Sequence, residues 1–226
     1  LFINIDQCIA IFYSQTLHRQ QNEQTLKIYN MKNFFSLLAT LLLVSNIAFG
    51  QTKWSVDPAH TNARFEIKHL GIAFVDGEFT KLEGQVESKD STSFENATVS
   101  FDIDVNSIDT RVDARNKHLL GDDFFSAEKF PKMTLKNATL KSAGKGKFKL
   151  TGDLTIKDVT KPVTFDVVQN NGIIQDPWGK TRAGFTAKTK INRFDYNINY
   201  ADKTPAGIDA VAPEVAITVN VEVVKN

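Results

Sequence analysis

Cysteine is nearly absent from this chain, since Cys8 is the only one among 226 residues. A single cysteine forms no intramolecular disulfide, and zinc sites built on cysteine pairs are excluded. Histidine is also scarce, and three of its four positions, His60, His69 and His118, follow residue 50. The fold must therefore be held by packing, and few cysteine or histidine side chains are available to bind zinc or transfer protons.

An excess of charge of one sign is lacking too. The chain has 27 Lys and Arg residues against 26 Asp and Glu residues. Residues 1–50 contain three of the basic side chains and two of the acidic ones, so 24 of each remain in the rest. A formally neutral domain argues against nucleic acid as a partner, because phosphate binding requires a basic surface.

No apolar run is long enough to span a membrane, which takes about 20 residues. The longest run, residues 34–44, follows a positive start at Lys32 and ends in the small-x-small pattern of residues 48–50. This arrangement is typical of a secretory signal peptide. We expect residues 31–50 to be a signal peptide cleaved after Gly50, and the product to be periplasmic or secreted.

The start of the sequence predicts three segments. Residue 1 is Leu and the first methionine is Met31, so we expect residues 1–30 to be a disordered upstream extension produced by a mis-assigned start. Residues 51–226 then form one domain, which is long enough to bury a sizeable core.

Alternation of apolar and polar residues dominates from Trp54 onward and predicts β-strands. In residues 97–106, ATVSFDIDVN, every second side chain from Ala97 to Val105 is apolar and the others are polar. Similar segments predict about eight or nine strands. Glycine-containing segments at 76–77, 142–146, 170–172 and 176–179 are predicted to be turns between antiparallel neighbours.

Residues 107–131 break this alternation and suit one short helix followed by an ordered loop. The resulting all-β fold is either a sandwich or a closed barrel, and an eight-stranded barrel has room for one small or elongated ligand. The 17 phenylalanines of the chain suit either a solid core or an apolar tunnel.

The sequence predicts neither a catalytic site nor a metal site. His69 shares a strand face with Phe65 and Ile67, whereas His60 lies in the preceding turn, so a structural role for each is favoured. The spacings H-E-x-x-H and G-x-S-x-G do not occur. Residues 102–113 have oxygen side chains at several calcium-loop positions, but Ser107 replaces the required glycine.

Four segments carry a resemblance to a known family: WSVDPAHTNARFEIKHLGIAFVDGEF (54–79), SIDTRVDARNKHLLGDDFFSAEKFP (107–131), LTGDLTIKDVTKPVTFDV (150–167) and DPWGKTRAGFTAKTKINRFDY (176–196). The chain resembles the YceI-like family of periplasmic, polyisoprenoid-binding, lipocalin-like barrels. The resemblance implies an extended antiparallel lipocalin-like β-barrel of about eight strands with one short helix and loop insertion. It also implies a long apolar tunnel without catalysis, and no cofactor beyond a bound isoprenoid or quinone-like lipid.

The predicted ligand-binding residues fall into three groups, and each apolar one could equally be ordinary core. The wall is predicted to comprise Phe65, Ile67, Phe79, Phe101, Ile103, Phe165 and Phe185. One end is predicted to be closed by Phe124, Phe125 and Phe130. The lipid head group is predicted to contact His69, Arg193 and Tyr196, although an internal salt bridge is an alternative role for Arg193.

The predicted partners are a long-chain amphipathic lipid, a second copy of the chain in a homodimer, and a membrane protein that donates or accepts the lipid. Two alternative functions stay open. One is an exported enzyme acting on a lipid-like substrate, with His60, His69 or His118 as general base. The other is a stress-response partner of a membrane protein, with the tunnel packed shut.

Overall fold

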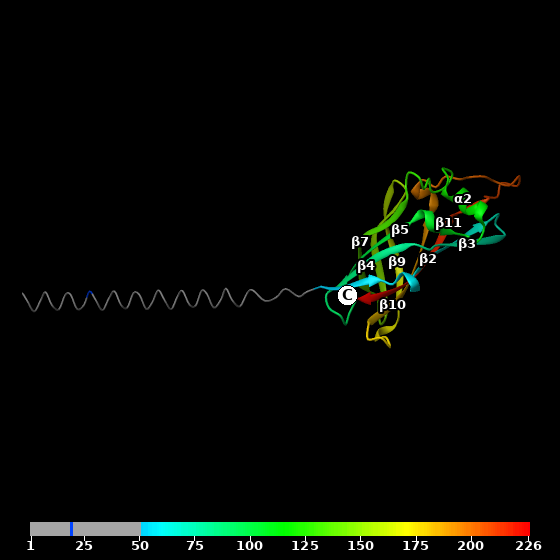
Figure 1. The fold of residues 1–226 in the computed structure, drawn as a ribbon. Helices are drawn as coiled ribbons and strands as arrows, with labels where there is room; N and C mark the ends of the chain where they lie inside the picture. Colours follow the sequence, from blue (N-terminus) through cyan, green and yellow to red (C-terminus); the bar gives the residue numbers. More distant parts are fainter. Residues whose placement is uncertain (1–18, 20–50) are drawn as a thin grey trace, which may run out of the picture. The chain divides into compact units, whose positions relative to one another are not determined.

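The alternating segments form the strands of one antiparallel sheet (Figure 1). The computed structural model describes Arg19 and residues 51–226, so the expectations for residues 1–30 and 31–50 lie outside the described residues, apart from Arg19 itself. The strands are β1 (Thr52–Val56), β2 (Asn62–His69), β3 (Ala73–Phe79), β4 (Leu82–Ser88), β5 (Thr98–Asp104), β6 (Ile108–Asp109), β7 (Lys132–Ser142), β8 (Lys147–Ile156), β9 (Val159–Gln175), β10 (Thr181–Asn192) and β11 (Val211–Lys225).

Eight of these strands close into a barrel in the order β1, β4, β5, β7, β8, β9, β10 and β11, and β11 pairs with β1 to complete the ring. Closure joins the two ends of the domain, since Trp54 pairs with Lys225 and Val56 with Val223. The other half of β11 pairs with β2, which extends the wall through β3 and β6. The predicted all-β barrel is confirmed, and the sandwich alternative is wrong.

Strand β5 shows how the sequence pattern positions side chains. Val99 is buried, Phe101 and Ile103 face the barrel interior, and Asp102 points outward and accepts a hydrogen bond from Lys136 Nζ at 2.6 Å. The period of two along a strand therefore separates an apolar inner face from a wet outer face, as predicted.

The insertion between β5 and β7 contains the predicted short helix, α2 (Asp113–Leu120). None of its residues is fully buried, and the ordered loop that follows buries Phe124 and Ala127. Three short 3-10 helices, η1 (Pro58–His60), η2 (Val105–Ser107) and η3 (Arg193–Tyr196), connect strands. Within the described residues, no helix is long and apolar enough to cross a membrane.

Two of the predicted turns are wrong. Asp76 and Gly77 lie inside β3, and the chain reverses instead at Leu70 and Gly71, which have φ of 50° and 71°. Gly77 is small for a packing reason, because a Cβ there would lie 2.6 Å from Cζ of Phe65.

Residues 170–172 lie inside β9, where the register with β10 shifts between Ala183 and Gly184. Asn171 has φ of 65° at this point. The segment is therefore a bulge rather than a turn. The turns at 142–146 and 176–179 do connect strands.

Candidate functional site

An apolar cavity of about 200 Å³ lies inside the barrel. Along β11 its wall extends from Val211 to Val221, roughly 34 Å of strand at about 3.4 Å per residue. The wall residues, in chain order, are Ala63, Arg64, Phe65, Ile67, Phe79, Leu82, Val86, Val99, Phe101, Ile103, Leu119, Phe124, Phe125, Met133, Thr134, Leu135, Leu140, Leu150, Leu154, Ile156, Phe165, Val167, Phe185, Ala187, Ile191, Arg193, Ile198, Val211, Val215, Ile217, Val219 and Val221.

The structure brings most of the predicted ligand-binding residues to this wall: Phe65, Ile67, Phe79, Phe101, Ile103, Phe124, Phe125, Phe165, Phe185 and Arg193. It places His69, Phe130 and Tyr196 outside the lining set. Small aliphatic side chains such as Val86 and Ala187 complete the wall, and they are not among the ligand-binding residues predicted from the sequence. The signal for them was present, because strand parity places Val86 on the same face as Leu82 and Ala187 on the same face as Phe185.

One end of the cavity has a packed floor. Three side chains there are at most 1% exposed and do not line the cavity, namely those of Trp54, Phe94 and Val223. The Phe94 ring centroid lies 4.9 Å from the ring centroids of both Trp54 and Phe185. Trp54 Nε1 donates to Ser88 Oγ at 3.0 Å, which satisfies the polar atom of the indole. The barrel is therefore sealed at this end.

The other end is built from the α2 insertion and from the segment around η3. Phe125 packs edge-on against Phe79 at a centroid distance of 5.8 Å. Phe124 stacks on Tyr200 at 4.9 Å, and His118 packs edge-on against Phe124 at 5.1 Å. Aromatic rings thus border the end of the cavity that lies opposite the floor.

Arg193 is a buried cation at this end of the cavity, with 3% of its surface exposed. Its Nε, Nη1 and Nη2 donate to the carbonyl oxygens of Ala212, Ile198 and Val211 at 3.0, 2.8 and 2.9 Å. Burial lowers the pKa of Arg193, although a guanidinium stays charged in proteins. Among residues 51–226 no carboxylate forms an ion pair with it. Its charge is compensated by the three carbonyl dipoles and, from farther away, by the charge of Asp209.

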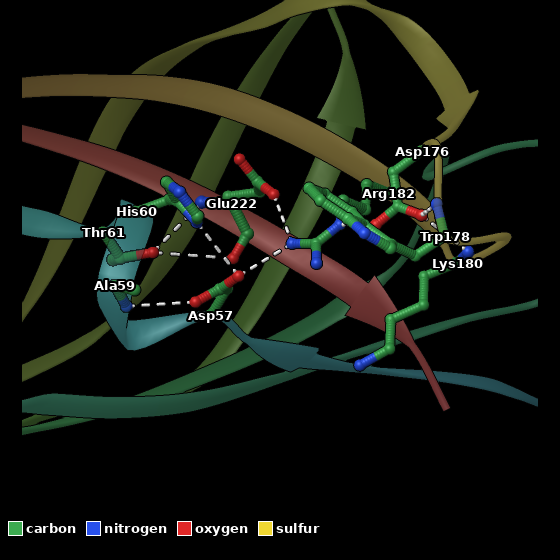
Figure 2. A network of polar contacts seen from close by, with 9 residues as sticks. All are labelled: Asp57, Ala59, His60, Thr61, Asp176, Trp178, Lys180, Arg182 and Glu222. Atoms are coloured by element: carbon green, nitrogen blue, oxygen red, sulfur yellow. Dashed lines mark hydrogen bonds and ion pairs between the residues drawn. The ribbon is translucent and has the colours of Figure 1, made fainter.

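A polar network on the outer wall joins three segments that are far apart in the sequence (Figure 2). Arg182 Nε donates to Asp176 Oδ2 at 2.6 Å, and Nη1 donates to Asp57 Oδ2 at 2.7 Å and to Glu222 Oε1 at 2.6 Å. Arg182 points outward because its neighbour Ala183 is buried on the inner face. The network ties η1, the β9–β10 turn and β11 together.

The hydrogen bond from Arg182, followed by that from His60, lowers the pKa of Asp57 from 3.8 to about 2. Asp57, His60 and Glu222 also place possible metal-ligand atoms within 4.8 Å of one another. However, Arg182 Nη1 already bonds both carboxylates. The cluster is consequently an ion-pair clamp, in which a guanidinium supplies the positive charge.

The three histidines of the described chain lie on different elements, and none lines the cavity. His60 Nδ1 is 3.1 Å from Asp57 Oδ2, and His118 Nε2 is 2.9 Å from Asp123 Oδ2. His69 is half-buried at the end of β2, paired with Ala73 and Val211. These residues form no joint acid–base site.

The fold and the site define an antiparallel β-barrel that is sealed at one end and encloses an apolar cavity. Residues 54–223 match the model of the YceI-like domain. The chain therefore belongs to the YceI-like family, and the resemblance seen in the sequence is confirmed.

Relatives support this assignment. A UPF0312 protein of Shewanella denitrificans is 36% identical over 167 residues, which cover 72% of this chain and 86% of the relative. The crystal structure of BcnA from Burkholderia cenocepacia matches with a TM-score of 0.61 and 26% identity, over 74% of this chain and 98% of that one. A polyisoprenoid binding domain from Saccharophagus degradans, implicated in plant cell wall breakdown, shares the fold with a TM-score of 0.53 and 16% identity, over 76% and 98% of the two chains.

Proposed function

We propose that this chain is an exported protein that sequesters or carries a polyisoprenoid or a similar long amphipathic lipid inside the barrel. The observation that carries the proposal is the apolar cavity, whose wall is aliphatic and aromatic except for Arg64, Thr134 and Arg193. The polyisoprenoid binding domain that shares the fold supports the class of ligand.

The energetics favour a long apolar tail. Each buried methylene group gains about 0.8 kcal/mol, so a tail of ten such groups gains roughly 8 kcal/mol before the entropic cost of binding. Few polar contacts are then required for tight binding. A wall made of many strands also holds the tail without a large conformational change, which limits the cost of ordering.

The head group of the lipid lies at the Arg193 end of the cavity in this proposal. The buried guanidinium has five N–H donors, and its three nitrogens each bond one backbone carbonyl. A phosphate, carboxylate or quinone oxygen would offer the charge or dipole that the surrounding apolar wall lacks. His69 and Tyr196 lie near the same end without lining the cavity, so we assign the first contact to Arg193.

Export to the periplasm or the exterior is part of the proposal, and it rests on the signal-like pattern of residues 31–50. A homodimer and a membrane protein that donates or accepts the lipid are the further partners that family membership suggests. N-terminal sequencing of the exported protein would locate the cleavage site, and light scattering would give the number of copies.

Blocking the cavity tests the binding function. Ala187 points inward on β10 and its neighbour Lys188 is exposed, so Ala187→Phe fills the cavity whereas Lys188→Phe adds the same ring outside. We expect delipidated wild type and Lys188→Phe to bind an added long-chain isoprenoid, and Ala187→Phe to lose at least about tenfold in affinity. Equal binding by Ala187→Phe and wild type would contradict the proposal.

The enzyme alternative makes a different prediction. It requires that His60→Ala, His69→Ala or His118→Ala abolishes turnover of a lipid-like substrate while the protein retains lipid weakly. The binding proposal expects all three variants to retain the lipid, because none of the three side chains lines the cavity.

A further inference from the structure

The floor of the cavity is made by a loop rather than by a strand. Phe94 belongs to the segment between β4 and β5, yet it is 1% exposed and packs inside the end of the barrel. Asp90 Oδ1 accepts hydrogen bonds from the N–H groups of Thr92 and Ser93 at 2.8 and 3.1 Å. The N–H of Asn96 donates to Leu140 O at 2.8 Å. The loop is therefore folded by a local turn at its start and bonded to β7 at its end, which holds the ring in place.

The cavity ends at the level of this ring. Phe185 and Val221 are paired across β10 and β11 and line the cavity, whereas the next inward pair, Ala183 and Val223, is buried and does not. Phe94 packs edge-on against Phe185, with an interplanar angle of 87°. A ligand tail that descends between Phe185 and Val221 would next meet Phe94.

We propose that Phe94 sets the greatest length of isoprenoid chain that the cavity accepts; this inference rests on the proposed lipid binding. A tail that reaches the floor while its head is at Arg193 fills the cavity. A longer tail must fold back or leave its head outside. Truncation of Phe94 to alanine removes six carbon atoms, about the size of one five-carbon isoprene unit, and the surrounding core collapses only partly onto the space left.

The experiment measures the affinity of the full exported chain for a series of linear isoprenyl alcohols that differ by one isoprene unit. We expect wild type to show a length beyond which affinity falls. In Phe94→Ala this limit moves to a chain about one unit longer, with at least roughly tenfold tighter binding of the first chain that wild type rejects. Val221→Phe raises the floor and moves the limit to a shorter chain.

Phe130→Ala is the matched control, because it removes the same atoms at a half-buried position that does not line the cavity. Its length limit stays that of wild type. If Phe94→Ala fails to fold, Phe94→Leu and Val221→Phe decide the question. An unchanged length limit in the folded floor variants would contradict the proposed role of Phe94 and leave lipid binding intact. Equal binding of all isoprenyl chain lengths by wild type would do the same. Failure of wild type to bind any length would instead refute the proposed function.

Discussion

Arg193 has a structural role, and the proposed function gives the same side chain a binding role. Its guanidinium organises the start of β11 through the carbonyls of Val211 and Ala212, and it also borders the cavity. Among residues 51–226 no carboxylate lies within ion-pair distance of Arg193, so the predicted salt bridge is not formed, although the charge of Asp209 acts on this guanidinium from farther away. A positive charge inside an apolar wall is costly unless it is compensated. The carbonyl oxygens supply part of this compensation, and a head group with negative charge or a strong dipole would add to it at this end.

Replacement of Arg193 should therefore discriminate between head groups. Hydrogen bonds to charged groups contribute about 1.5–3 kcal/mol, so we expect Arg193→Gln to bind an isoprenyl phosphate roughly ten- to a hundredfold more weakly than wild type. Binding of the matching hydrocarbon, which has no head group, should change far less. Arg193→Lys keeps the charge and should retain part of the preference. Equal losses for both ligands in calorimetric titrations would show that Arg193 acts on the fold alone.

The clamp around Arg182 makes a prediction about pH. The pKa of Asp57 is about 2 in the folded protein against 3.8 for the free group, so the folded state favours the ionised carboxylate. The stabilisation is fully present above the unfolded pKa and is lost as the pH falls toward 2. We expect the free energy of unfolding of wild type to exceed that of Asp57→Asn above pH 4, and the difference to shrink on acidification.

Urea unfolding between pH 2 and pH 6 would measure this difference. Asp166→Asn is the control, because its side chain is 74% exposed and its ion pair with Lys149 lies on the surface. A gap between wild type and Asp57→Asn that is constant over this range would contradict the linkage.

The positions of some inward-facing residues could be predicted from the sequence, and those of others could not. The aromatic wall followed from alternation, because strand parity alone places Phe101 and Phe185 inside. Phe94 was missed because it lies in a loop, where no periodicity indicates burial. Asn197 ends η3 with φ of 56°, a left-handed conformation that asparagine tolerates.

At the scale of elements, the β2–β3 hairpin links backbone packing to the shape of the cavity. Gly77 lies opposite Phe65 in β2, and a Cβ on it would meet the Phe65 ring at 2.6 Å and Thr110 Cγ2 at 2.8 Å. The sequence predicts a turn at Gly77, because glycine is common in turns. The tertiary contact that actually requires it becomes visible only when the two strands are paired.

Gly77→Ala should consequently push Phe65 into the cavity. We expect a loss of about 1–3 kcal/mol in the free energy of unfolding, as is usual for overpacking, together with weaker lipid binding. Gly172→Ala is the matched control, because a Cβ there meets no atom within 4 Å. Denaturant unfolding and lipid titration of both variants would check this. If the two variants lose similar stability, the Phe65 contact does not explain the glycine.

At the scale of the whole molecule, the inner faces of the strands form a solid core at one end of the barrel and the wall of the cavity along the rest. Trp54 and Val223 pack into a solid core at one end, while Val211 to Val221 enclose space. Alternation predicted the strands, but it does not specify which strands meet. The pairing of β1 with β11, which are separated by most of the domain, was not predicted, because long-range closure leaves no local signal. The family resemblance implied only that the strands form a barrel.

Mass spectrometry of an organic extract of the gently purified exported protein tests lipid storage in the barrel most directly. We expect one long-chain isoprenoid or similar amphipathic lipid per chain in wild type, and little or none in Ala187→Phe. A wild-type extract without lipid, in a protein that also fails to bind added isoprenoid, would contradict the proposed function.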